Sequence, residues 1–262
     1  MQKGGMLMEA LRIENVCLKY QAKNGGITAF EDISFTVEQG RFLSIVGPSG
    51  CGKSTLLSVI AGLLPASKGR VLVHGKQVVG TSPSIGYMLQ RDNLLEWRTI
   101  LSNVLLGLEI RGQKTPQTIA RAEQLLATYG LADFAQKYPR QLSGGMRQRV
   151  ALIRTLATGP DILLLDEAFS ALDYQTRLTV TDDVYRILKQ EGVTTLLVTH
   201  DIPESISMGD DVLILSARPA TVKEIMHIDL GAQRTPLSVR SNPNFSQYFD
   251  HIWKELRANE TA

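Results

Sequence analysis

The sequence predicts an α/β fold with a parallel sheet and an inserted block of helices. Three observations carry this prediction. Short apolar runs typical of buried strands alternate with helical patterns near both ends of the chain. A glycine-rich loop separates one such run from a helical pattern, and residues 92–158 are rich in helix formers. Strands that alternate with helices are typical of parallel sheets.

The elements before residue 92 begin with short strands. Leu11, Ile13 and Val16 open the first strand. Apolar and polar residues then alternate over 33–37, the period of a half-buried strand, and the apolar run 42–46 suits a central strand. A helix is expected from Lys53 to about residue 61, because the glycine that follows is a typical helix end.

The later elements return to the strand and helix alternation after the Gly159-Pro160 pair. Helical patterns are expected at Ile119–Tyr129, Arg147–Ala157 and Leu178–Gln190, and strands at Ile162–Leu165, Thr195–Thr199 and Val212–Leu215. The tail from about residue 231 is polar and ends in a short predicted helix, Phe245–Leu256. The sequence does not specify the role of this tail.

Composition excludes several classes of protein. The chain has 262 residues, 44% hydrophobic and 21% charged, and a net charge of +2, which argues against a nucleic-acid partner. The two cysteines, Cys17 and Cys51, have no metal-ligand spacing and fit a reducing compartment. Because no apolar run reaches the length of a membrane span and no secretory signal is evident, we expect a cytosolic protein.

The segment 47–54, Gly-Pro-Ser-Gly-Cys-Gly-Lys-Ser, fits the phosphate-binding loop pattern G-x-x-x-x-G-K-[ST]. Backbone N–H groups of such a loop surround a triphosphate, and the next helix points its N-terminus at the anion. The expected nucleotide contacts are Gly47, Pro48, Ser49, Gly50, Cys51, Gly52, Lys53, Ser54 and Thr55. Lys53 would reach the β- and γ-phosphates and Ser54 would bind Mg²⁺, so ATP and Mg²⁺ are the expected cofactors. The alternative is a glycine-rich turn with an incidental lysine.

An apolar strand, residues 162–165, ends in the acidic pair Asp166 and Glu167. Because ligands bind at the carboxyl ends of parallel strands, Asp166 is expected to hold Mg²⁺ there, directly or through water. Glu167 is the expected general base that activates the attacking water. The alternative is a strand whose end happens to be acidic, with Glu167 in solvent.

The segment 142–148, Leu-Ser-Gly-Gly-Met-Arg-Gln, lies 18 residues before Asp161. Alone it could be a turn with a helix cap, but its order relative to the other two motifs resembles the ABC transporter ATPase family. Most members have Gln where Met146 stands. The resemblance implies the ABC ATPase fold: a P-loop NTPase core (11–91 and 159–225), an antiparallel β subdomain, a helical subdomain (92–158) and a C-terminal tail (226–262), in one domain of 262 residues.

The same resemblance implies further site residues. Tyr20 would stack on adenine, or be a strand-edge aromatic. Gln90 would sense Mg²⁺ and the γ-phosphate and link the site to the membrane partner, or be a polar loop residue. His200 would contact the γ-phosphate and join Glu167 and Lys53 as catalytic, although a lone histidine at a strand end is more often structural.

The segment 142–148, called the signature from here on, implies a partner chain. In this family Ser143, Gly144 and Gly145 contact the γ-phosphate bound to the opposite subunit, and the segment 170–173 crosses the dimer interface. The alternative for that segment is a helix start capped by Ser170, and both could hold together. Because the chain has one copy of each motif, we expect a homodimer.

The resemblance extends to one importer subgroup through residues 94–108, 216–219 and 252–256. Its members carry nitrate, sulfonates, taurine, bicarbonate or pyrimidines. An ATP-hydrolysing importer subunit is therefore expected at the cytoplasmic face of the membrane, with a separate permease and a substrate-binding protein as partners. The subgroup usually has Pro where Glu96 stands. The alternatives are an exporter, a soluble ABC ATPase not linked to transport, and a regulatory module that does not hydrolyse ATP.

Overall fold

The computed structural model describes residues 8–21, 26–231 and 234–257. The larger of its two sheets has six strands, in the order β10-β9-β3-β8-β7-β6. They are β3 (Phe42–Val46), β6 (Ile85–Met88), β7 (Ile162–Asp166), β8 (Thr194–Val198), β9 (Asp211–Leu215) and β10 (Val222–His227). The strands from β9 to β6 are parallel, and β10 pairs with β9 in the antiparallel sense at one edge. The predicted parallel sheet is confirmed.

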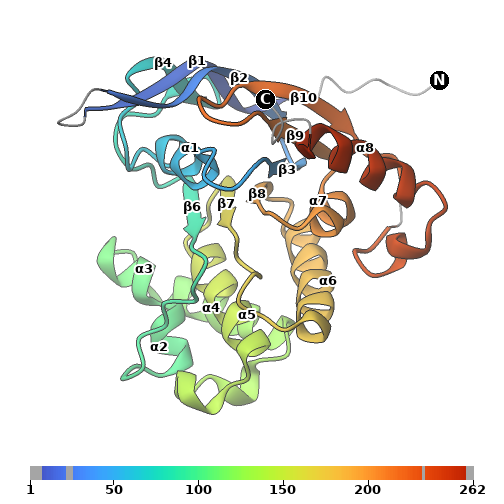
Figure 1. The fold of residues 1–262 in the computed structure, drawn as a ribbon. Helices are drawn as coiled ribbons and strands as arrows, with labels where there is room; N and C mark the ends of the chain where they lie inside the picture. Colours follow the sequence, from blue (N-terminus) through green and yellow to red (C-terminus); the bar gives the residue numbers. More distant parts are fainter. Residues whose placement is uncertain (1–7, 22–25, 232–233, 258–262) are drawn as a thin grey trace, which may run out of the picture.

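The second sheet is antiparallel, with the order β2-β1-β4-β5. Its strands are β1 (Glu9–Tyr20), β2 (Ile27–Glu38), β4 (Lys68–Val73) and β5 (Lys76–Gln77). Figure 1 shows this sheet across the top of the molecule, with helix α1 (Lys53–Ile60) below it. The antiparallel part that the family resemblance implied is therefore present.

The central strands are continuous apolar runs because both faces of their sheet are covered. In β7, Leu163 and Leu165 pack into a core shared with the helical region, whereas Ile162 and Leu164 pack into a core shared with α1 and the antiparallel sheet. Consecutive residues therefore face opposite cores, and the sheet holds the carboxyl ends of its strands in fixed positions.

The helices between β6 and β7 form the lower part of the molecule in Figure 1. They are α2 (Ile100–Val104), α3 (Leu106–Ile110), α4 (Pro116–Thr128) and α5 (Gly144–Leu156), with 3₁₀ turns at Ala132–Phe134 and Pro139–Gln141. Residues 92–158, all of which the structure describes, contain helices and turns and no strand. The subdomain boundaries given above stay predictions.

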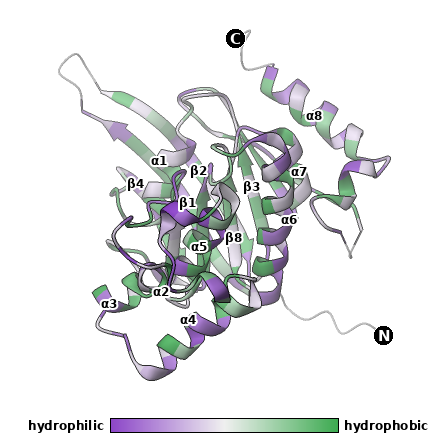
Figure 2. Cartoon of the chain, turned by 90° about the horizontal axis from the view of Figure 1, so that it is seen from below, coloured by the Kyte–Doolittle hydropathy of each residue, from purple (hydrophilic) through white to green (hydrophobic). Residues whose placement is uncertain are grey.

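The remaining helices are α6 (Tyr174–Glu191), α7 (Ile202–Met208) and α8 (Phe245–Arg257), with a 3₁₀ turn at Ser238–Ser241. Figure 2 shows hydrophobic residues in the central strand β3, whereas the peripheral helices α4 and α8 carry both hydrophobic and hydrophilic residues. Helix α8 uses its apolar face, with Ile252 fully buried, to join a third core with α7 and β9. The predicted tail helix is confirmed.

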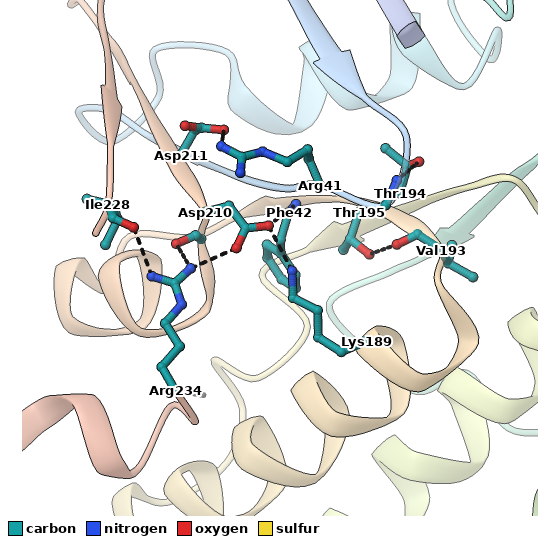
Figure 3. A network of polar contacts seen from close by, with 12 residues as sticks. Arg41, Phe42, Lys189, Val193, Thr194, Thr195, Asp210, Asp211, Ile228 and Arg234 are labelled. Atoms are coloured by element: carbon teal, nitrogen blue, oxygen red, sulfur yellow. Dashed lines mark hydrogen bonds and ion pairs between the residues drawn. The ribbon is translucent and has the colours of Figure 1, made fainter. Parts of the chain in front are cut away.

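The tail is anchored beneath β3 by a network of charges, shown in Figure 3. The Arg234 guanidinium donates to Ile228 O (3.2 Å) and to Asp210 Oδ1 (2.9 Å), and the Lys189 ammonium lies 2.8 Å from Asp210 Oδ2. The Phe42 N–H donates to the same oxygen at 2.9 Å. Burial alone would raise the pKa of Asp210, but Lys189, the Phe42 N–H and Arg234 together lower it. The tail is thus joined to the strand that precedes the phosphate loop.

Candidate functional site

The glycine-rich loop connects β3 to α1, and two of its glycines have backbone angles that other residues rarely adopt. Gly50 has φ 72° and Gly52 has φ 112°. Gly47 is needed for close packing, because a Cβ there would lie 3.0 Å from both Cys51 Sγ and Leu215 Cβ. Gly52 caps α1 without a side-chain hydrogen bond, so the N–H groups of the first turn remain available to an anion.

Lys53 is buried, with 7% of the residue exposed, and its ammonium already lies over the loop. Nζ donates to Gly47 O at 2.8 Å and to Pro48 O at 3.0 Å. These carbonyls hold the charge in place of water, which lowers the cost of burying it. The ammonium is thus positioned where an incoming phosphate would meet it.

Asp166, the last residue of β7, is held through both carboxylate oxygens. Ser54 Oγ donates to Oδ1 at 2.7 Å, and Tyr87 Oη donates to Oδ2 at 3.0 Å. Burial raises the pKa of Tyr87 to about 12, so its hydroxyl keeps its proton at neutral pH and acts as the donor. The sequence analysis missed Tyr87, although it lies three residues before Gln90.

These residues fit a nucleotide-bound Mg²⁺. The described residues contain no group of three or more His, Cys, Asp or Glu that could hold a metal alone. Magnesium does not require such a group, because it usually binds one or two protein oxygens together with substrate phosphates and water. Because Ser54 donates its proton to Asp166, the lone pairs of its oxygen are free to bind a cation.

Glu167 follows β7 in a left-handed backbone conformation, with φ 46°. Its N–H donates to Val198 O at 2.9 Å, which fixes the strained residue against the neighbouring strand β8. Its Oε2 lies 3.4 Å from Nδ1 of His200, two residues after that strand. The structure therefore brings together the predicted base and the predicted γ-phosphate contact.

A cavity of about 520 Å³ opens between the phosphate loop and this pair. Its lining residues are Ser49, Gly50, Gly52, Lys53, Ser54, Thr55, Glu167, His200 and Arg218. The guanidinium of Arg218, which the sequence analysis did not select, donates to Gly50 O at 2.5 Å. Arg218 lies in the loop after β9, within the segment 216–219 that resembles the importer subgroup, but that resemblance gave it no role at the nucleotide site.

Gln90 reaches Glu167 through one hydroxyl. Gln90 Nε2 donates to Ser170 Oγ at 3.0 Å, and that hydroxyl donates to Glu167 O at 2.9 Å. The expectation that Ser170 caps a helix is wrong. Helix α6 is capped by Asp173, whose side chain accepts from Thr176 N at 3.1 Å, and the Ser170 hydroxyl is occupied by the two contacts above.

The signature lies elsewhere in the chain. Ser143 caps α5, and its Oγ accepts from Met146 N at 3.3 Å. A Cβ on Gly145 would lie 2.8 Å from Val180, so this glycine allows α5 to approach α6. Among the described residues that line the cavity, none comes from 143–145. Tyr20 ends β1, is 42% exposed, and is likewise not among them.

Comparison with known proteins agrees with this geometry. The ABC transporter family model matches residues 30–170. The chain is 48% identical to the uncharacterised ABC transporter ATP-binding protein YtlC of Bacillus subtilis, over 97% of this chain and 98% of that one. It is 37% identical to the nitrate import ATP-binding protein NrtD of Synechocystis sp. (96% of each chain) and 35% identical to the taurine import ATP-binding protein TauB of Jannaschia sp. (94% and 93%).

Two solved structures share the fold. One is a dimeric ATP-binding cassette in a post-hydrolysis state, bound to ADP and phosphate, with 30% identity and a TM-score of 0.70 over 84% of this chain and 99% of that one. The other is CbiO1 of Clostridium perfringens, with 26% identity and a TM-score of 0.73 over 84% and 88%. The chain belongs to the ABC transporter family, as one of its ATP-binding, ATP-hydrolysing subunits.

Proposed function

We propose that this chain powers an ABC-type importer, coupling ATP binding and hydrolysis to the uptake of a small solute through a separate permease. The observation that carries the proposal is the cavity in which Lys53, Glu167 and His200 meet at the phosphate loop. The nitrate and taurine import proteins among its relatives support the role of an importer subunit. The proposed cargo is a small solute of the nitrate, sulfonate, taurine, bicarbonate or pyrimidine type.

The proposed chemistry is in-line attack of water on the γ-phosphate. Lys53 and the loop N–H groups hold the phosphates, and Glu167 accepts the proton of the attacking water. His200, whose Nδ1 lies 3.4 Å from Glu167 Oε2, contacts the γ-phosphate beside that base. Ser54, Asp166 and Gln90 would hold Mg²⁺, which neutralises charge on the phosphates when it is bound.

We also propose that the working unit is a dimer in which Ser143, Gly144 and Gly145 complete the cavity of the other chain. The lone signature, remote from the phosphate loop of its own chain, supports this arrangement, as does the dimeric ATP-binding cassette among the solved relatives. Adenine stacking by Tyr20 is part of the same proposal and is supported by its exposed ring at the end of β1.

A groove lined in part by Ile85 and Tyr87 of β6, the strand that precedes Gln90, supports a permease partner. It has a volume of about 500 Å³ and is lined by Ala61, Leu63, Thr81, Ser82, Pro83, Ile85, Tyr87, Arg111 and Gln113. Leu63 is 53% exposed, and Ile110, next to Arg111, is 77% exposed. Exposed apolar side chains at the rim of a groove are typical of protein contacts.

No helix in the described part of the chain could span a bilayer. We propose that the permease, assisted by a substrate-binding protein, holds this chain at the cytoplasmic face of the membrane.

Co-expression with a candidate permease from a neighbouring gene tests the proposal. We expect the two proteins to copurify, and Leu63→Arg to abolish copurification while ATP binding is kept. Ile225→Arg, on β10, is the matched control, because Ile225 is 46% exposed but is not part of the groove. A wild-type chain that hydrolyses ATP and never copurifies with the permease would favour an ATPase not linked to transport.

A further inference from the structure

We propose that Tyr87 is a positioning residue for Asp166, and that it links the groove to the magnesium-binding carboxylate. Its hydroxyl donates to Asp166 Oδ2 at 3.0 Å, and the same side chain lines the groove. One residue therefore contacts both the expected metal ligand and the expected partner surface. The groove's occupant rests on the proposed function, whereas the hydrogen bond to Asp166 does not.

The register of the sheet fixes this contact. Tyr87 lies on β6, paired with Leu164 of the parallel strand β7, and Asp166 is two residues further along β7. Because residues two apart on a strand point to the same face, Leu164 and Asp166 share a side of β7. The hydrogen bond thus joins two side chains whose backbones are held in register by the sheet, while the ring of Tyr87 can still move.

The hydroxyl of Tyr87 differs from that of Ser54 in what it can do. Ser54 is in the phosphate loop and is itself an expected ligand of Mg²⁺, so its contact with Asp166 changes with the nucleotide site. Tyr87 lies outside the cavity lining and holds the other carboxylate oxygen from a strand. Partners that hydrogen-bond a metal-binding carboxylate orient it, and their loss commonly weakens metal binding by about 10- to 100-fold.

The link to the groove follows from the position of the ring. A permease segment seated between Leu63 and Arg111 would contact the Tyr87 side chain, since all three residues line the same groove. A small displacement of the ring would lengthen or shorten the bond from its hydroxyl to Asp166. The partner surface would then act on the metal site without passing through Gln90.

The test uses the full chain and a fluorescent ADP analogue, whose Kd is measured in EDTA and in saturating Mg²⁺. We expect Tyr87→Phe to leave the Kd in EDTA unchanged and to reduce the Mg²⁺-dependent gain in affinity by about tenfold. The matched control is Tyr129→Phe, which removes a similar bond, from Tyr129 Oη to Glu191 Oε1 at 2.7 Å, away from the cavity and the groove. Tyr129→Phe should behave as wild type.

The positioning role is overturned if Tyr87→Phe keeps the full Mg²⁺-dependent gain, if it weakens binding equally in EDTA, or if Tyr129→Phe gives the same change. The link to the groove is tested on the complex with the permease. Assembly should change the Mg²⁺-dependent gain in wild type and leave it unchanged in Tyr87→Phe. An equal response of the two proteins, or none in wild type, overturns the link. A failure to copurify would instead count against the permease proposal and leave the EDTA comparison intact.

Discussion

The phosphate loop with its cavity, called the cradle here, and the signature are two regions that are both expected to contact the γ-phosphate. The cradle is already assembled within one chain, where Lys53 lies over the loop and Asp166 is held by two hydroxyls. The signature, in contrast, forms the start of α5, which Ser143 caps and which packs against α6. The signature is folded but does not line the cavity of its own chain. This difference supports the proposal that the functional site spans two chains.

Glu167→Gln should have the largest effect on turnover, because it removes the proposed general base from the cradle. We expect turnover to fall by about 10²- to 10⁴-fold, the usual contribution of a general base. ATP binding should be kept, since Gln has nearly the same shape as Glu. Steady-state phosphate release and ATP affinity would be measured together. Undiminished turnover would remove Glu167 from the mechanism.

Gly144→Asp attacks the other region and should lower turnover by about 10²-fold, because a carboxylate would meet the partner's γ-phosphate. A Cβ at Gly144 lies 3.4 Å from Leu172, an ordinary contact, so the folded chain should accept the change. ATP affinity of the isolated chain should equal that of wild type. If the ATP affinity of the single chain falls instead, the signature acts on the cradle of its own chain, and the proposed site between two chains is wrong.

Glu204→Gln should have the smallest effect on turnover, because it changes the stability of the fold and not ATP binding. Burial raises the pKa of Glu204, on α7 behind His200, to about 7. The folded state therefore keeps this proton up to about pH 7, whereas the unfolded state releases it near pH 4.5. The stability that the neutral carboxyl contributes is fully present below pH 4.5. It is lost as the pH rises through about 7, by up to about 3 kcal/mol.

Because Gln stays neutral, the variant should gain stability relative to wild type between pH 5 and pH 8. Urea unfolding at the two pH values measures that difference. A variant that loses stability equally at both values would show that Glu204 is ionised in the folded chain.

The motif residues were predictable because their chemistry is local in sequence. The loop 47–54 needs glycine at fixed places, and Asp166 must end a buried strand, so both can be recognised from a sequence pattern. Strand β6 has no such pattern, because Gly86 interrupts its apolar run. A Cβ at Gly86 would lie 2.6 Å from Thr155 on α5, so packing requires glycine there, and the glycine weakens the strand pattern. Missing β6 meant missing Tyr87.

Other contacts depend on the fold and have no sequence signal. Arg218 reaches the phosphate loop from a connection that is 168 residues away in sequence. A helix cap was one alternative for Ser170, because the sequence did not show that Asp173 would cap that helix or that Gln90 would lie beside Ser170. Long-range polar contacts of this kind become visible only when the strands are in register.

The most direct test of the two-chain site is the mass in solution of the Glu167→Gln chain, measured by light scattering with and without ATP and Mg²⁺. We expect the mass of one chain without nucleotide and the mass of two chains with it, with one ATP bound per chain. Adding Gly144→Asp should return the protein to the mass of one chain while ATP stays bound. A Glu167→Gln chain that is saturated with ATP and keeps the mass of one chain would rule out a site shared by two chains.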